Sequence, residues 1–254
     1  MLTIILLILF LVLIISVFIV VYIRYVLYTK DRIEERFYIL LKLHASNVSE
    51  FKFGFFLGRS VFIVFLEEFH AVHYIVKEVC GNGMTLLKKS EMVDLAYLCT
   101  YYGLRNDGKI LREVLKDYND TFINELISAI SYDMEVTGLK YDYFNGHERE
   151  LSHYFRHIYE IISFIDRQGS LSRKEKSAYV AILCAQLSAD EQAFMFLHMN
   201  SRIVKSWFDN SLFVKYSTIK GLSKSFLCEN TEIDIKARFP EIIFDWEYQG
   251  KMSI

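Results

Sequence analysis

The sequence predicts an all-α fold, in which a single apolar transmembrane helix near the amino terminus is followed by a helical-bundle domain. Residues 2–23 are an uncharged apolar run. Beyond them, apolar residues recur at intervals of three and four, which is the period of a helix that buries one face. The only proline among the 254 residues is Pro240, so the residue that most readily ends a helix is missing from nearly all of the chain.

The apolar run reads LTIILLILFLVLIISVFIVVYI. A helix needs about 20 residues to cross the hydrocarbon core of a bilayer. No basic stretch precedes the run and no small-residue cleavage motif follows it, so an anchor is favoured over a cleaved signal peptide. Positive residues come afterwards, from Arg24 to Arg36, and the positive-inside rule therefore places the following domain in the cytoplasm. We expect residues 1–30 to form the anchor.

Residues 31–222 are expected to form the cytosolic helical domain. Helices are predicted at residues 38–48 and 58–79, from Ser90 to about Gly103, and from Asn119 or Asp120 to just before Gly138. A Cys-Gly-Asn-Gly turn at residues 80–83 follows the second helix. Strand-like alternation is poor throughout and only patchy at residues 233–245. The tail from residue 223 to 254 therefore has no clear predicted structure.

Two Ser-x-x-Glu capping boxes mark helix starts in the later part of the chain. They are Ser172 with Glu175, and Ser188 with Glu191. In each box the serine hydroxyl accepts a hydrogen bond from a free helix amide, and the glutamate accepts one from the serine N–H. The second box predicts that residues 174–200 form two helices with a break at residues 187–189.

The most unusual element is the predicted helix after Gly146, GHERELSHYFRHIYEIISFID. At 100° per residue, one stripe collects Arg149, His153, Arg156, Glu160 and Arg167, here called the His/Arg stripe. The opposite side collects Leu151, Tyr154, Phe155, Ile158, Ile161, Ile162 and Ile165. His157 lies at the border. The helix is therefore amphipathic, with a basic and imidazole-rich polar face.

Two interpretations of this stripe remain open. An amphipathic helix ordinarily presents its charged residues to solvent and nothing more. A solvated face has no need of His and Arg, however, whereas a site for phosphate or carboxylate does. Guanidinium binds these groups bidentately, and imidazole exchanges protons near neutral pH.

The composition limits the kinds of binding site that the chain can contain. A net charge of −2 gives no overall basic field for nucleic acid, so any such binding needs a local patch. The four cysteines are isolated, which indicates reduced thiols instead of a disulfide framework or zinc knuckle. His70 and His73, with Glu67, have helical ligand spacing, but such a pair is common by chance. We expect no metal and no cofactor.

The same helix carries a family resemblance. Its residues 146–147, 151–157 and 165–166 resemble the hallmark of the AbiC-like phage abortive infection proteins. Further agreement comes from residues 185–188 with Glu191, Asn200-Ser201, residues 213–216, Leu43-His44, and Gly58-Arg59 with Phe62. The resemblance covers about residues 38–222, and a membrane-anchored amino terminus is common in this family.

The resemblance implies bacterial antiphage defence, in which an infected cell halts before phage are released. We expect a sensor or effector in the bacterial inner membrane, single-pass and with its amino terminus outside. The alternative is a HEPN-like, metal-independent ribonuclease, in which His153 with Arg149 or Arg156 would be catalytic; whether chemistry occurs stays open. The expected binding residues are Gly146, His147, Tyr154, His157, Gln186, Glu191 and Asn200. The expected partners are the lipid bilayer, a phage-encoded trigger and a second copy of the chain, with RNA only under the alternative.

Overall fold

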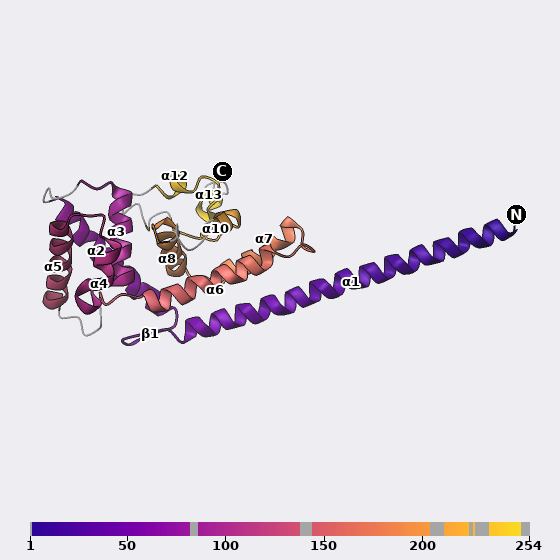
Figure 1. Ribbon diagram of the computed structural model, residues 1–254, viewed down its shortest axis with the longest axis horizontal. Coiled ribbons are helices and arrows are strands. Elements are labelled where there is room, and N and C mark those ends of the chain that lie inside the picture. Colours follow the sequence, from indigo (N-terminus) through magenta and orange to yellow (C-terminus); the bar gives the residue numbers. More distant parts are fainter. Residues whose placement is uncertain are drawn as a thin grey trace.

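The computed structural model describes residues 2–81, 86–137, 144–203, 211–223, 226 and 234–249. It confirms the predicted all-α class: one long apolar helix is followed by a compact set of helices (Figure 1). The only strands in the described part of the chain are two strands of two residues each, which form one hairpin. The long helix, α1, projects far beyond the helical domain, and the first described residues lie at its free end (Figure 1).

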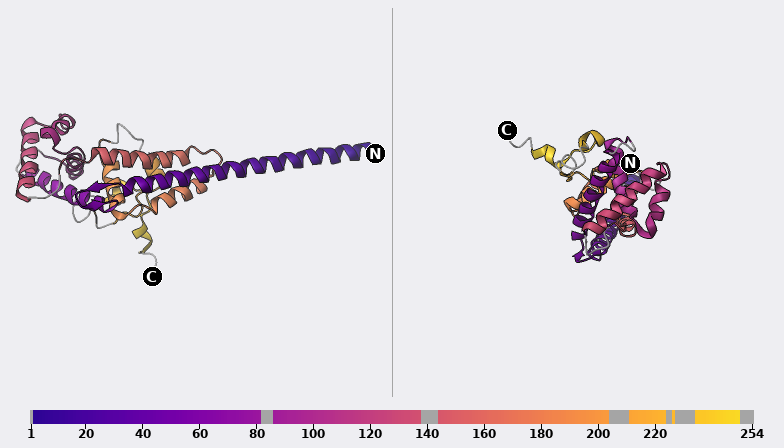
Figure 2. Two further views of the ribbon diagram at one scale, coloured as in Figure 1. Left: turned by 90° about the horizontal axis from the view of Figure 1, so that it is seen from below. Right: turned by 90° about the vertical axis from the view of Figure 1, so that its left-hand side faces the viewer.

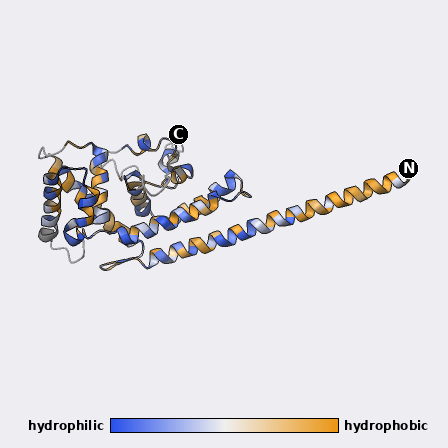
Figure 3. Cartoon of the chain, in the orientation of Figure 1, coloured by the Kyte–Doolittle hydropathy of each residue, from blue (hydrophilic) through white to orange (hydrophobic). Residues whose placement is uncertain are grey.

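Helix α1 spans Leu2–Ser49 without interruption. Its residues 2–25 are all exposed, and burial begins only at Val26. Within this exposed part, an 18-residue window has a mean hydropathy of 3.8 and no buried residue, so it is long and apolar enough to span a membrane (Figure 3). The helix predicted at residues 38–48 is the carboxyl end of this same helix, because no Gly or Pro separates it from the apolar run.

A short hairpin reverses the chain after α1. Strands β1 (Lys52–Phe53) and β2 (Phe56–Leu57) pair antiparallel, with Phe53 opposite Phe56. Gly54 adopts a φ of 57°, which only glycine takes without strain. The sequence does not predict this hairpin, because two-residue strands are too short to show an alternating pattern.

The domain is built around α2. The principal helices are α2 (Ser60–Gly81), α3 (Lys89–Tyr102), α4 (Arg105–Val114), α5 (Asp120–Thr137), α6 (Glu148–Asp166), α7 (Arg173–Cys184) and α8 (Ala189–Asn200). α2 packs against α3, α5 and α8, whereas α6 packs along α1 and against α7 (Figure 2). The described part of the remaining chain holds three short helices, α10 (Ser211–Lys215), α12 (Ile235–Arg238) and α13 (Asp245–Gln249). The described tail residues 234–249 thus hold helical turns and no strand.

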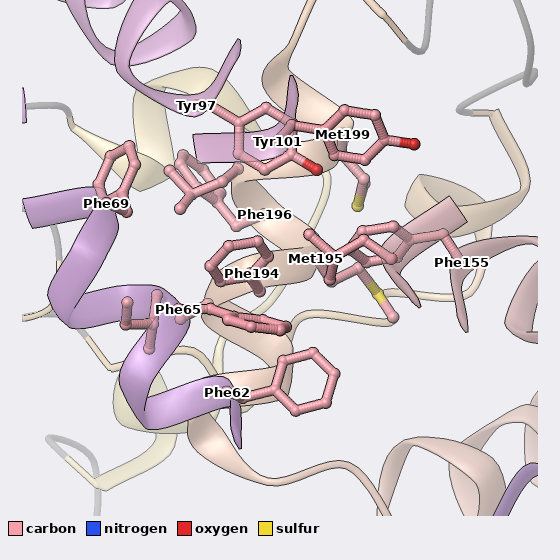
Figure 4. Close-up of a cluster of buried hydrophobic side chains, with 14 of the residues drawn as sticks. Phe62, Phe65, Phe69, Tyr97, Tyr101, Phe155, Phe194, Met195, Phe196 and Met199 are labelled. Carbon is pink, nitrogen blue, oxygen red and sulfur yellow. The ribbon is translucent and has the colours of Figure 1, made fainter. Parts of the chain in front are cut away.

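The core is rich in aromatic rings. Figure 4 shows Phe62, Phe65 and Phe69 of α2 facing Tyr97 and Tyr101 of α3, Phe155 of α6, and Phe194 and Phe196 of α8. Cys80, Cys99 and Cys184 are free and buried, and Cys228 lies outside the described residues. Burial raises the pKa of the Cys99 and Cys184 thiols to about 12, which leaves them protonated and unreactive.

Both predicted capping boxes are confirmed. The Ser172 hydroxyl accepts from the Glu175 amide, and the Ser188 hydroxyl accepts from the Glu191 amide. The helices α7 and α8 that meet at the second box are bent by 115°. Taken together these two helices are also long and apolar enough to span a membrane, but most of α8 is buried in the domain.

Candidate functional site

The start of α6 is held against the end of α3 by two facing glycines. Gly146 has a φ of +83° and Gly103 a φ of +64°. A Cβ on Gly146 would overlap the Tyr102 carbonyl. The close approach lets the His147 amide donate to the Tyr101 carbonyl at 2.9 Å. This contact fixes where α6 begins, and so where its side chains point.

The predicted faces of α6 are confirmed. Leu151, Tyr154, Phe155, Ile158, Ile161, Ile162 and Ile165 are all buried. Every residue of the His/Arg stripe is exposed, and His157 is half-buried at the border. The only stripe members joined by an ion pair in the described structure are Arg167 and Glu160, at 3.6 Å and largely in solvent.

A cavity of about 230 Å³ separates the carboxyl end of α1 from α6, and we call it the α1–α6 cavity. Its lining consists of His44, Asn47, Glu50, Phe51, Arg149, Glu150, His153, Tyr154 and His157. The cavity therefore brings together four α6 residues that the sequence singled out, namely Arg149, His153, Tyr154 and His157. Their partners on the other wall come from α1 and the residues just after it, about 100 positions earlier in the chain.

His44 is the most unusual group in this cavity. Its side chain is 1% exposed, and its ring stacks on His157 with centroids 5.7 Å apart. Neither ring nitrogen has a hydrogen-bond partner among the described residues. Burial, then the neighbouring charges of His157 and Arg59, lower the pKa of His44 to about 4. His44 is therefore a neutral imidazole at physiological pH, with one unused donor and one unused acceptor.

His157 completes the stack. Burial, then the charge of His153, lowers the pKa of His157, and its Nδ1 also has no partner among the described residues. A buried polar atom without a partner carries a free-energy cost that a bound polar ligand would remove. The α1–α6 cavity thus combines unused imidazole nitrogens with the exposed guanidinium of Arg149 and the exposed imidazole of His153.

Glu191 joins three helices beside this cavity. Its carboxylate is fully buried and accepts from the Tyr154 hydroxyl at 3.0 Å and from the Ser188 amide at 2.7 Å. Arg59 of the α2 start lies 3.3 Å from the same carboxylate. Burial, then the Glu191 charge, raises the pKa of Tyr154 well above its usual value, so Tyr154 remains a hydrogen-bond donor. These contacts tie α2, α6 and α8 together.

His147 also has a structural role, because it links two helices. Its Nε2 lies 2.9 Å from the buried Glu68 carboxylate, and its ring stacks on Phe65 at 3.8 Å. The pair joins the start of α6 to the middle of α2. With Gly146, His147 borders a second cavity of about 330 Å³ beneath the hairpin. The local sequence gives no sign that Glu68 is its partner, since 79 positions separate the two residues.

Arg156 belongs to the His/Arg stripe but does not line the α1–α6 cavity. It lines a small cavity of about 100 Å³ with Tyr101, Glu148, Ser152 and His198. Burial lowers the pKa of His198 to about 3, and its Nδ1 lies 2.8 Å from the Tyr97 hydroxyl. The structure thus brings Arg149 and His153 to one cavity and places Arg156 at another. His198 and Tyr97 were missed because the contact joins residues 101 positions apart.

The remaining sequence candidates lie elsewhere. Gln186 lies partly exposed in the turn between α7 and α8. The Asn200 side chain accepts from Arg238 Nε at 2.7 Å, which links α8 to α12. Neither residue lines the cavities described above. Within the described ranges, no group of three or more His, Cys, Asp or Glu side chains is arranged to hold a metal ion.

The fold and the site define an all-α protein in which a polar cavity lies between an exposed apolar helix and a histidine-rich amphipathic helix. Residues 146–227, which begin at the glycine before α6, match the family model described as "Putative phage abortive infection protein". The match confirms the resemblance seen in the sequence within residues 146–222. No match to a curated protein or to a solved structure was found.

Proposed function

We propose that this protein is a membrane-anchored antiphage defence protein that senses infection and halts the infected cell. The family match over residues 146–227 supports the role in abortive infection. The exposed apolar part of α1 supports anchoring in the bacterial inner membrane. The basic residues that follow this segment favour an amino terminus outside and a cytoplasmic domain.

One observation favours a sensing role. α6, the first helix of the family-matched segment, packs along the same α1 that continues into the apolar segment. The α1–α6 cavity lies between these two helices and holds His44 with both ring nitrogens unused. A phage-derived or infection-induced ligand that enters the cavity would bind both helices at once. Binding would then change the packing of the anchor helix against the domain.

A phage plaque assay tests this proposal. Cells would express the wild-type chain, the Arg149→Ala/His153→Ala variant, or a control in which the exposed Lys109 and Lys116 become alanine. We expect protection to be lost only in the first variant, at unchanged abundance in the membrane fraction by immunoblot. Protection equal to wild type in that variant would show that the stripe is only a solvated face.

The ribonuclease alternative also has an observation in its favour. Arg149 and His153 lie one helical turn apart at the mouth of the α1–α6 cavity, so a cation and a proton carrier could act on one phosphodiester. Total RNA from infected cells separates the two proposals. Cleavage products seen with the wild type and absent from Arg149→Ala/His153→Ala would favour the ribonuclease. Intact RNA alongside full protection would exclude it.

A further inference from the structure

We propose that the turn between α6 and α7 is a second membrane contact, which docks on the headgroups of anionic phospholipids. The docking surface consists of Arg167, Arg173 and Lys174, together with Arg32 on the facing side of α1. The inference rests on the proposed transmembrane placement of α1. It adds that the domain lies against the bilayer surface and does not hang freely from its anchor.

The first argument is position. Of the described domain, the α6–α7 turn reaches farthest along α1 toward the exposed apolar segment (Figures 1 and 2). Lys30 of α1 bonds Glu175 of α7 at 2.6 Å, which places the start of α7 at the level of Lys30. Lys30 is six residues beyond Arg24, or about 9 Å along a helix.

The second argument is depth in the bilayer. If residues 2–23 span the hydrocarbon core, the headgroup layer extends about 5–8 Å further, to roughly Tyr28. The turn lies at the edge of this layer. Long Lys and Arg side chains extend from a backbone toward the charged groups of an interface, so Arg173 and Lys174 can reach the lipid phosphates.

The third argument is charge. Residues 24–36 and 166–176 contain eight Lys and Arg against five Asp and Glu, in a chain whose net charge is −2. The local excess of three positive charges is therefore opposite in sign to the rest of the molecule. Arg32, Arg173 and Lys174 are exposed and have no ion-pair partner among the described residues. Each cation near an anionic membrane surface adds to the attraction between the domain and the bilayer.

The fourth argument is an open groove beside the turn. A cavity of about 470 Å³ lies between α1 and the end of α6, with Arg32, Arg36, Phe164 and Gln168 in its lining. The Arg36 guanidinium lies over the Phe164 ring, 5.3 Å from its centroid, and is held there facing the groove. Arg32 is four residues nearer the apolar segment than Arg36, so it adds an exposed cation at the end of the groove that faces the bilayer, whereas Arg36 and Phe164 lie farther from the lipid.

Hydrogen exchange on the full chain in lipid nanodiscs tests the proposal. Exchange of the backbone amides of residues 167–174 would be followed in phosphatidylcholine alone and in a mixture with phosphatidylglycerol. We expect exchange to be several-fold slower in the mixture, and the difference to disappear in the Arg173→Glu/Lys174→Glu variant and in high salt. The Lys109→Glu/Lys116→Glu control changes the same charge on exposed residues of α4 and the turn after it and should behave as wild type.

Three results would overturn docking on the bilayer. Equal exchange in both lipids would show that the turn does not touch the headgroups, and equal slowing in the variant would show that these cations are not responsible. The same slowing on adding soluble glycerol phosphate to phosphatidylcholine nanodiscs would show an ordinary anion site. A chain that does not enter nanodiscs would instead disprove the transmembrane placement, and loss of phage protection is scored separately in the plaque assay.

Discussion

At the scale of single residues, the domain contains imidazoles that remain neutral because they are buried. His44 has a pKa of about 4, whereas an imidazole in the unfolded chain titrates near its ordinary value of 6.5. Between these two values the unfolded state binds a proton that the folded state does not, so stability falls as pH falls. The folded chain should therefore be least tolerant of mildly acidic conditions.

Replacing His44 by leucine should remove this dependence. The substitution loses no hydrogen bond made by the imidazole in the described structure, and the leucine side chain can pack against the Tyr154 ring beside it. Relative to wild type, we expect the free energy of unfolding of His44→Leu to rise by about 2 kcal/mol between pH 8 and pH 5. Urea denaturation at both pH values measures the change, and an equal difference at both would contradict a depressed pKa.

Gly146 provides a second prediction at this scale. Alanine there would combine a strained positive φ with a methyl group against the Tyr102 carbonyl. We expect Gly146→Ala to destabilise the domain by about 3 kcal/mol or more, seen as a lower midpoint in thermal unfolding. Gly169→Ala is the matched control, because nothing lies within 4 Å of its added methyl group. Similar midpoints for both variants would argue against the α3–α6 contact.

At the scale of elements, the break between α7 and α8 depends on the second capping box. Ser188→Ala should cost about 1 kcal/mol, because the Glu191 amide loses its acceptor at the start of a buried helix. Ser172→Ala alters the equivalent box at the exposed start of α7 and should cost less. Chemical denaturation of the two variants compares them directly. A larger loss in Ser172→Ala would show that α7, and not α8, determines the fold of this region.

The helices α6, α7 and α8 show which features can be predicted from the sequence and which cannot. The periodicity of α6 predicts all seven buried residues and the exposed stripe, and the two serines predict the helix starts of α7 and α8. Local patterns do not predict contacts between distant elements. The stacking of His44 on His157 and the pairing of Glu68 with His147 arise only when α1, α2 and α6 pack together. The sequence therefore predicts one wall of the α1–α6 cavity and not the other.

At the scale of the whole molecule, the two ends of α1 lie in different environments. Its residues 2–25 are exposed, whereas Ile33, Phe37 and Leu41 are buried in the domain core. Deleting residues 2–25 should leave a folded domain whose thermal midpoint lies within a few degrees of the full chain. Deleting residues 2–41 removes three buried apolar side chains, each contributing about 2–5 kcal/mol, and should abolish cooperative unfolding. Circular dichroism of the two truncated chains measures both outcomes.

The continuity of α1 has a mechanical consequence. Forty-eight residues of uninterrupted helix form a rod about 72 Å long, with no Gly or Pro to act as a joint. Such a rod transmits torsion, so the azimuth of each apolar residue is fixed relative to the domain that packs on the other end. A single alanine inserted near Tyr25 would rotate the apolar segment by about 100°, whereas seven would return it to nearly its original phase. Any output that depends on which side of this segment meets a neighbour should follow the helical period of such insertions.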